Sequence, residues 1–241
     1  MPRQAPSPAG DAPQRRLVHG RRRGRKLRPG QQELLRSLLP RLRFELPASG
    51  RLDPPALFAT PLEACWLEIG FGGGEHLAAQ AEAHPGIGML GAEVFENGVV
   101  KLLGEVARRG LGTIRLFTDD ARLLLAALPE ASLQRVFILF PDPWPKLRHH
   151  KRRMVSNETL DRLAFVMADG AELRLATDDR DYLSWMLERA TDHRDFAWLA
   201  RGPEDWRQRP ADWPPTRYEQ KALAAGRVPA FLRFRRRNRQ G

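Results

Sequence analysis

The sequence predicts a Rossmann-like α/β fold, in which a doubly wound, mostly parallel sheet lies between two layers of helices. Short apolar runs alternate with longer amphipathic segments from about Gln31 onward, and the links between them are short. Such strict alternation is typical of a parallel sheet built from strand–helix–strand units. Residues 136–140 are apolar at every position, which is typical of a central strand that is covered on both faces.

The expected elements begin and end at ordinary local signals. A glycine run follows the first strand, His84-Pro85-Gly86 closes the first helix, and Gly110 closes the second. The expected strands are 65–69, 87–94, 114–117, 136–140, 171–177 and 230–235, and the expected helices are 75–83, 97–109, 121–128, 157–168 and 182–190.

Charge divides the chain into a body and two basic ends. The 241 residues carry a net charge of +11, and their 42% hydrophobic content suits one globular domain. Residues 1–30 and 227–241 hold the basic excess, whereas the part between them is slightly acidic. We therefore expect a disordered basic arm over 1–30 and a single domain over 31–241 with a basic C-terminal tail. Basic ends usually bind polyanions such as nucleic acid or anionic lipid, although a solvated terminus or an organellar transit peptide has the same composition.

Several protein classes are excluded by what the sequence lacks. Cys65 is the only cysteine, which excludes an internal disulfide or a cysteine-based zinc site and indicates a reducing compartment. The scattered histidines show no metal-ligand spacing, so we expect no metal. No apolar run approaches the length needed to cross a bilayer. We therefore expect a soluble cytoplasmic protein with no membrane partner.

The first strand leads into a glycine loop. In doubly wound sheets ligands bind at the carboxyl ends of the strands, and here Glu68 is followed by Gly70, Gly72 and Gly74. The third glycine of the dinucleotide fingerprint would fall on Glu75, so a pyrophosphate-binding loop is not indicated. The E-x-G-x-G-x-G spacing instead resembles the loop of S-adenosylmethionine (SAM) methyltransferases, where Glu68 would accept from an ammonium group. A turn that serves only helix–strand packing is the alternative.

Acidic residues also follow the second and third strands. Glu93 lies 23 residues beyond Gly70, at the place where an acid accepts both hydroxyls of a ribose. Asp119 and Asp120 precede the next helix, where a carboxylate can accept from an adenine amino group or cap the helix. We expect one of the pair to cap and the other to contact the ligand. Acids after three successive strands favour a cationic cofactor such as SAM.

The segment after the fourth strand combines an acid, an aromatic residue and a cationic strip. Three prolines stiffen the loop around Asp142, and Trp144 follows, so that a carboxylate and an aromatic ring are held at the strand end, where the ring could stack on a base or pack under the loop. The basic residues beyond them are expected to bind phosphates; they are Lys146, Arg148, Lys151, Arg152 and Arg153. A proline-stiffened loop with a solvated basic face is the alternative.

Two later segments are expected at the same edge of the sheet. Thr177 and Asp178 end the fifth strand, where Asp178 could instead cap a helix. Residues 216–219 combine a hydroxyl, a guanidinium, a phenol and a carboxylate, which by composition alone indicate an exposed helix start.

Five motifs occur in an order that resembles one family. They are LEIGFGGGEHL, GAEVFENG, FPDPWPKLRHHKRR, ATDD and TRYEQKALAAG, and the resemblance covers roughly Gln31 to Arg235. Together they are similar to the bacterial tRNA (guanine-N7)-methyltransferase family. This resemblance implies a class I SAM-methyltransferase fold. It also implies methyl transfer from SAM to N7 of a guanine in the tRNA variable loop, position 46, forming 7-methylguanosine.

The resemblance also implies roles for individual residues. Asp142 matches the catalytic position. The cofactor contacts are Glu68, Glu93, Asp120 and Asp142, together with Gly70 and Gly72 of the glycine loop. The substrate contacts are Lys146, Asp178, Thr216, Arg217, Tyr218 and Glu219. Asp119 is one step from Asp120, so either could contact the cofactor.

Other questions stay open at this point. The long basic arm departs from the family pattern, and a role for it in tRNA binding is inferred from its charge alone. Both a monomer and a homodimer are compatible with the sequence. The rival functions are a SAM methyltransferase for a small molecule or a protein arginine, and a nucleic-acid-binding protein without catalysis.

Overall fold

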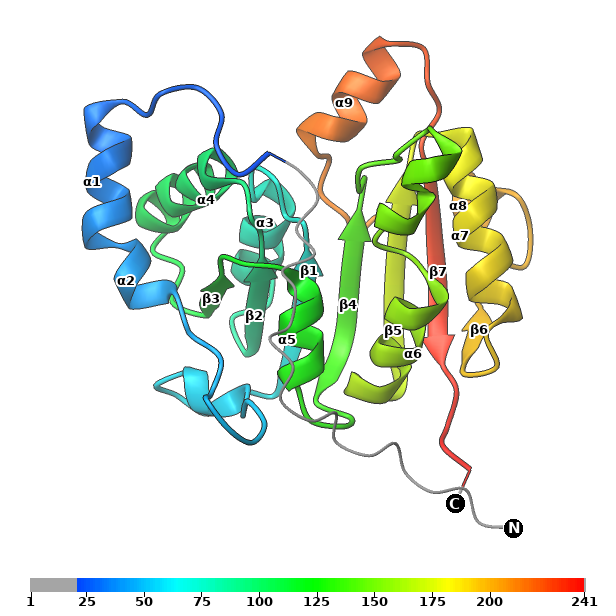
Figure 1. The fold of residues 1–241 in the computed structure, drawn as a ribbon, viewed down its shortest axis with the longest axis horizontal. Coiled ribbons are helices and arrows are strands. Elements are labelled where there is room, and N and C mark those ends of the chain that lie inside the picture. The colour runs from blue at the N-terminus through cyan, green and yellow to red at the C-terminus, as the bar shows by residue number, and fades with distance from the viewer. Residues whose placement is uncertain (1–20, 241) are drawn as a thin grey trace.

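A seven-stranded sheet forms the centre of the protein in a computed structural model that describes residues 21–240 (Figure 1). The strand order is β3-β2-β1-β4-β5-β7-β6. The first five strands are parallel, β7 is antiparallel to β5, and β6 is antiparallel to β7. The strands are β1 (Ala64–Ile69), β2 (Ile87–Ala92), β3 (Ile114–Phe117), β4 (Leu133–Leu139), β5 (Met167–Thr177), β6 (Phe196–Trp198) and β7 (Ala230–Arg236). The predicted doubly wound, mostly parallel fold is confirmed.

Helices cover both faces of the sheet. Side chains of α5, α6 and α7 pack in the core on one face, and those of α3 and α4 pack in the core on the other. Along β1 the side chains alternate between the two cores, so that Leu67 lies in the first and Trp66 in the second. The helices are α1 (Pro29–Ser37), α2 (Leu39–Leu42), α3 (Glu75–Ala83), α4 (Glu96–Arg109), α5 (Ala121–Ala127), α6 (Asn157–Val166), α7 (Arg180–Asp192), α8 (Glu204–Arg207) and α9 (Arg217–Ala224).

The structure differs from the sequence prediction in the middle of the chain. The helix expected over 157–168 ends at Val166, and the strand expected from residue 171 begins at Met167. Met167 pairs with Leu133 before the register between β4 and β5 shifts. Tertiary pairing therefore overrides the local helical pattern. The short elements β6 and α8 were not predicted, because three or four residues carry too little periodicity.

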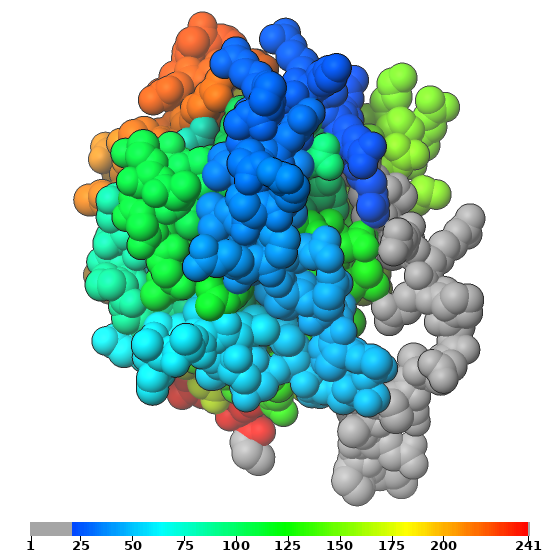
Figure 2. All heavy atoms as spheres, turned by 90° about the vertical axis from the view of Figure 1, so that its left-hand side faces the viewer, coloured from blue at the N-terminus to red at the C-terminus, as the bar shows by residue number. Residues whose placement is uncertain are grey.

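The N-terminal boundary also differs from the prediction. Residues 1–20 of the expected arm lie outside the described residues, but residues 21–28 lie along the start of α4. The Glu96 N–H donates to the Arg22 carbonyl (2.9 Å), and the Gly24 N–H donates to Asn97 Oδ1 (2.7 Å). Helix α1 then begins at Pro29 and packs against α4. Figure 2 shows residues 21–42, in blue, running down the middle of this side of the molecule. The ordered body therefore begins before Gln31.

The carboxyl ends of the parallel strands lie at the upper edge of the sheet in Figure 1, where α9 and residues 21–28 also lie. Within residues 21–240, no helix is both long enough and apolar enough to cross a membrane.

Candidate active site

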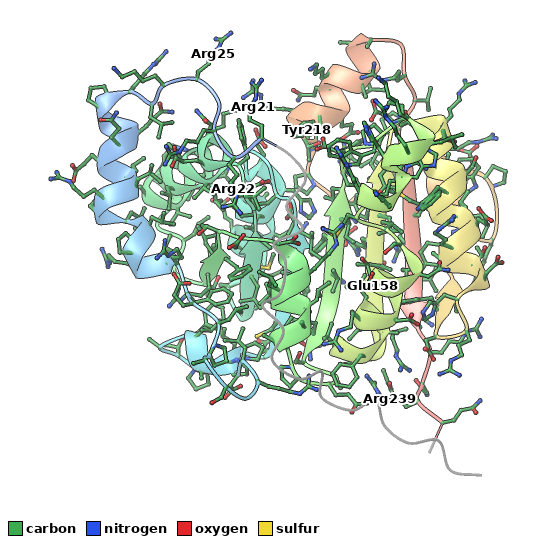
Figure 3. All side chains as sticks on the ribbon, in the orientation of Figure 1. Arg21, Arg22, Arg25, Glu158, Tyr218 and Arg239 are labelled. Carbon is green, nitrogen blue, oxygen red and sulfur yellow. The ribbon has the colours of Figure 1, made fainter. Side chains whose placement is uncertain are left out.

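A cavity of about 380 Å³ opens at the carboxyl ends of β1, β2 and β4. Its wall contains Gly70, Gly72, Glu93 and Asp142, together with Arg21 from the segment before α1 and Tyr218 from α9. A second cavity of about 100 Å³ shares Gly70 and Glu93 with the first and is lined further by residues 119–122. Figure 3 shows Arg21 and Tyr218 close together at this end of the sheet. The cavity lies where a doubly wound sheet binds its ligand.

The glycine loop forms the floor of the cavity. Gly70 and Gly72 have φ angles of 72° and 55°, in the left-handed region that glycine adopts without strain. A Cβ atom at Gly72 would lie 2.9 Å from the Tyr218 ring. On the other side of the loop, a Cβ at Gly98 of α4 would lie 2.2 Å from the Gly72 carbonyl oxygen. The loop is therefore held between α4 and α9 at Gly72, where neither Gly72 nor Gly98 has room for a side chain.

Glu93 lies in the wall between the two cavities. Its carboxylate accepts hydrogen bonds from the backbone N–H groups of Gly72 (2.8 Å), Val94 (2.8 Å) and Phe95 (2.9 Å). Burial raises the pKa of Glu93 above its usual value. The three hydrogen bonds lower the pKa by a smaller amount, and the negative charge of Asp142 raises it further. A carboxylate held in this way still has lone pairs for the hydroxyl donors of a ribose.

The acidic pair before α5 divides its roles. Asp120 is buried and caps α5 by accepting from the Arg122 N–H (3.0 Å). Asp119 accepts from the Asp120 N–H (2.9 Å) and from Arg22 Nη2 (3.0 Å). Both residues line the smaller cavity. Asp120 is therefore the helix cap of the pair. Which of the two aspartates contacts the cofactor stays a prediction.

Glu68 lies beneath the cavity and is absent from its wall. It is 3% exposed, and its Oε2 lies 2.7 Å from Nδ1 of His76, which is equally buried in α3. His76 was not predicted as a site residue, because only the fold brings it to Glu68.

Asp142 projects from a strained loop. Phe140 and Trp144 have φ angles of 50° and 47°, a conformation that costs a residue with a side chain about 1–3 kcal/mol. Within the described chain Asp142 makes no hydrogen bond, and partial removal from water raises the pKa of its carboxyl group. The loop therefore holds an exposed carboxylate at the cavity wall, and no residue of the described chain donates a hydrogen bond to it.

Arg153 does not fit the predicted phosphate-binding role. Its guanidinium is 1% exposed, donates to the Pro143 carbonyl (2.8 Å), pairs with Asp181 and stacks on the rings of Tyr182 and Trp185. Every one of these partners is a group of the protein itself, and three of them belong to α7, so Arg153 anchors the 140–153 loop to α7. That correction follows from burial, which the run of cations in the sequence did not reveal.

The other cations of the loop are more accessible. Lys146, Arg148 and Lys151 are exposed to solvent. Arg152 lines the cavity, and its guanidinium lies 5.0 Å from the centre of the Trp144 ring. Burial and the surrounding cations lower the pKa of His149, which meets the same ring edge-on.

The predicted substrate residues of α9 separate into two pairs. Thr216 and Glu219 are buried; Thr216 caps α9 by accepting from the Glu219 N–H (3.2 Å), and Glu219 accepts from Arg209 (3.0 Å). Arg217 and Tyr218 are exposed, and Tyr218 covers Gly72. The first pair thus shapes the helix, and the second pair is available to a ligand.

Asp178 follows the end of β5 and lines neither of the two cavities. Asp178 accepts from Arg227 Nε (2.6 Å), and the cap of α7 is the next residue, Asp179. The rival capping role considered for Asp178 is therefore wrong. In the described part of the chain, no group of three or more His, Cys, Asp or Glu side chains is placed to hold a metal ion.

Known proteins match this chain over most of its length. Residues 63–231 match a family model described as "Putative methyltransferase". A tRNA (guanine-N(7)-)-methyltransferase from Rhodospirillum rubrum is 55% identical over 92% of this chain and 88% of its own length. The chain belongs to the tRNA (guanine-N(7)-)-methyltransferase family.

A second family member, from Paramagnetospirillum magneticum, is 50% identical over 95% of this chain and 96% of its own length. Among solved structures, a variant of the 16S rRNA (adenine(1408)-N(1))-methyltransferase from Catenulisporales acidiphilia, determined with its cosubstrate SAM, has a TM-score of 0.52. That chain is 17% identical over 79% of this chain and 94% of its own, a likeness that shows the fold alone. The fold is thus shared with methyltransferases outside the family.

Proposed function

We propose that this protein transfers the methyl group of SAM to N7 of a guanine in tRNA, at position 46 of the variable loop, in the cytoplasm. The observation that carries the proposal is the placement of Asp142, a carboxylate in the wall of a cavity whose rim is cationic, with no hydrogen-bond partner within residues 21–240. The family supports the same substrate, because its members are named for methylation of guanine N7 in tRNA.

The cavity fits SAM by the chemistry of its walls. Partial removal from water raises the pKa of both Glu93 and Asp142, and a cationic ligand between the two carboxylates would favour their charged forms. The residues that would hold SAM are Glu68, Gly70, Gly72, Glu93 and either Asp119 or Asp120. When bound, SAM supplies an electrophilic methyl group on a sulfonium.

Guanine N7 needs no general base, because it carries an in-plane lone pair and no proton. The protein's task is to place N7 in line with the methyl group. Methylation makes the purine cationic, and Asp142 is placed to stabilise that charge or to accept from the N–H groups of the base. Tyr218 and Trp144 border the same space and offer ring surfaces to the base.

The exposed cations around the cavity are suited to the tRNA backbone. Lys146, Arg148 and Lys151 come from the loop after β4, Arg217 from α9, and Arg23 and Arg25 from the segment before α1. These three segments lie at the same edge of the sheet (Figure 1). Phosphate contacts of this kind give an affinity that falls steeply with salt.

Transfer of labelled methyl from SAM to unmodified tRNA tests the proposal, followed by borohydride and aniline, which cut the chain at 7-methylguanosine. A single cut in the variable loop is expected. Labelled tRNA that is not cut would move the target to another atom. Failure to label tRNA, with SAM still bound, would point to a small-molecule or protein substrate.

A further inference from the structure

His76 lies between Glu68 and the segment that leads into α9. It is the second residue of α3, and its Nδ1 lies 2.7 Å from Oε2 of Glu68, with the two side chains 2% and 4% exposed. On its other sides the imidazole meets the ring of Phe137 (centroids 4.7 Å apart) and that of Trp213 (6.2 Å). The ring therefore has one fixed orientation.

The hydrogen bond has a definite direction. A carboxylate can only accept, so with Glu68 as a carboxylate the Nδ1 of His76 is the donor and Oε2 of Glu68 is the acceptor. A carboxylate this deeply buried is costly unless it is paired. Within the described chain, no donor other than His76 contacts Glu68, so its second oxygen has no partner. A donor brought by a ligand would complete the site.

We propose that His76 is a positioning residue for the amino-acid part of SAM. By holding one oxygen of Glu68, it turns the other oxygen toward the cofactor's ammonium group. The inference rests on the proposed function for the identity of the cofactor. His76 itself touches neither the cofactor nor the tRNA; it acts through Glu68.

Ring packing is the competing explanation for His76. One turn along α3, the Gln80 side chain donates to the Asp212 carbonyl (2.8 Å), so this face of α3 also supports the segment before α9. A residue that served only to fill this space would need a ring and no donor. The two roles can therefore be separated by substitution.

Two variants remove one role each. His76→Phe keeps a ring against Phe137 and Trp213 but removes the donor, whereas His76→Asn keeps a donor near the Nδ1 position and removes the ring. Each is titrated by calorimetry with S-adenosylhomocysteine, which carries the ammonium group, and with 5′-methylthioadenosine, which lacks the whole amino-acid part.

His76→Phe is expected to weaken binding of S-adenosylhomocysteine about tenfold, the usual effect of losing a hydrogen bond to a charged group, and to leave 5′-methylthioadenosine unchanged. His76→Asn is expected to retain the wild-type ratio of the two affinities and to lower the melting temperature. Equal losses for both ligands in His76→Phe would overturn the proposal. So would a loss specific to S-adenosylhomocysteine in His76→Asn.

A double-mutant cycle covers the risk that a buried, unpaired Glu68 unfolds His76→Phe. In the Glu68→Gln background the same substitution should change S-adenosylhomocysteine binding less than twofold, because the two residues act as one unit. A full tenfold loss in that background would contradict the proposal. Failure of the wild-type protein to bind S-adenosylhomocysteine at all would instead refute the proposed function.

Discussion

The two sides of the cavity are built in different ways. The floor consists of strand ends and the glycine loop, where backbone groups fix the geometry: three N–H groups hold Glu93, and positive φ angles shape Gly70 and Gly72. The roof consists of residues 21–25, the 140–153 loop and α9. Side chains make most of its contacts, as Arg153 does for the loop, and one backbone hydrogen bond joins Arg22 to the start of α4. The floor is suited to a constant cofactor, and the roof to a large substrate that must enter and leave.

The largest effect is expected from the roof, at Asp142. Asp142→Ala should lower kcat about 100-fold or more, the usual effect of removing a group that stabilises developing charge. Single-turnover methyl transfer at saturating SAM measures it. Asp192 is an exposed acid at the end of α7, and Asp192→Ala is the matched control, which should leave kcat unchanged. Full activity in Asp142→Ala, with none in Arg152→Ala, would reverse the assignment of roles.

The anchor of the roof should matter for folding as well as for activity. Arg153→Met removes a buried guanidinium together with its hydrogen bond to Pro143 and its pairing with Asp181, and should destabilise the protein by about 2–4 kcal/mol. Urea unfolding measures the loss. The exposed neighbour provides the control: Lys151→Met should change stability by less than about 0.5 kcal/mol. Similar values for both variants would show that Arg153 is no anchor.

The exposed cations of the roof should act through tRNA affinity alone. Replacing Lys146, Arg148 and Lys151 together by Ala should make the plot of log affinity against log salt less steep, reducing the magnitude of its negative slope by about 2–3. Filter binding between low and moderate salt gives the slope, and calorimetry should find SAM binding unchanged. An unaltered slope would place the phosphates elsewhere on the protein.

Lowering the pH should change kcat through Asp142 in the roof and the KM for SAM through Glu93 in the floor. The pKa of Asp142 is raised, so kcat is expected at full value above that pKa and to fall as the pH drops through it, at a higher pH than for an ordinary aspartate. The pKa of Glu93 is also raised, so the KM for SAM should rise on acidification. Asp142→Asn should remove the acid limb of kcat and keep the change in KM. A limb that survives in Asp142→Asn would belong to another group.

The smallest effect is expected where the roof meets the floor. Arg22→Ala removes the contact with Asp119 at the edge of the smaller cavity and should speed the release of SAM about threefold, because exposed ion pairs contribute little. Stopped-flow displacement measures the release rate. Arg23, which is 82% exposed, is the control. Slower release in Arg22→Ala would mean that Arg22 occupies the cavity rather than closes it.

The floor was predictable from sequence, because local patterns determine it. An apolar run followed by glycines places Gly70 and Gly72 at a strand end, and Glu93 follows the next strand in the same way. Parallel pairing then brings these ends to one edge without further information.

Most of the roof could not be predicted, since its contacts join residues distant in sequence. In the sequence, Arg153 is indistinguishable from the other cations of its basic run. Only the structure shows that it is buried beside Tyr182 and Trp185. Arg22 reaches Asp119 across 97 positions of the chain. Thr216 and Glu219 match a capping pattern as well as a binding motif, and the structure was needed to show that the cap is made.

The position of β7 in the sheet has a consequence for folding during synthesis on the ribosome. This last strand lies between β5 and β6, so both of those strands present unpaired edges until residues 230–236 have left the ribosome. The growing chain already contains every residue of the cavity by the time Tyr218 is made, but its sheet is still open. A chain that lacks residues 230–236 therefore exposes unpaired strand edges that can pair with those of neighbouring chains. Such a chain is expected to aggregate, and pairing of β7 removes both edges.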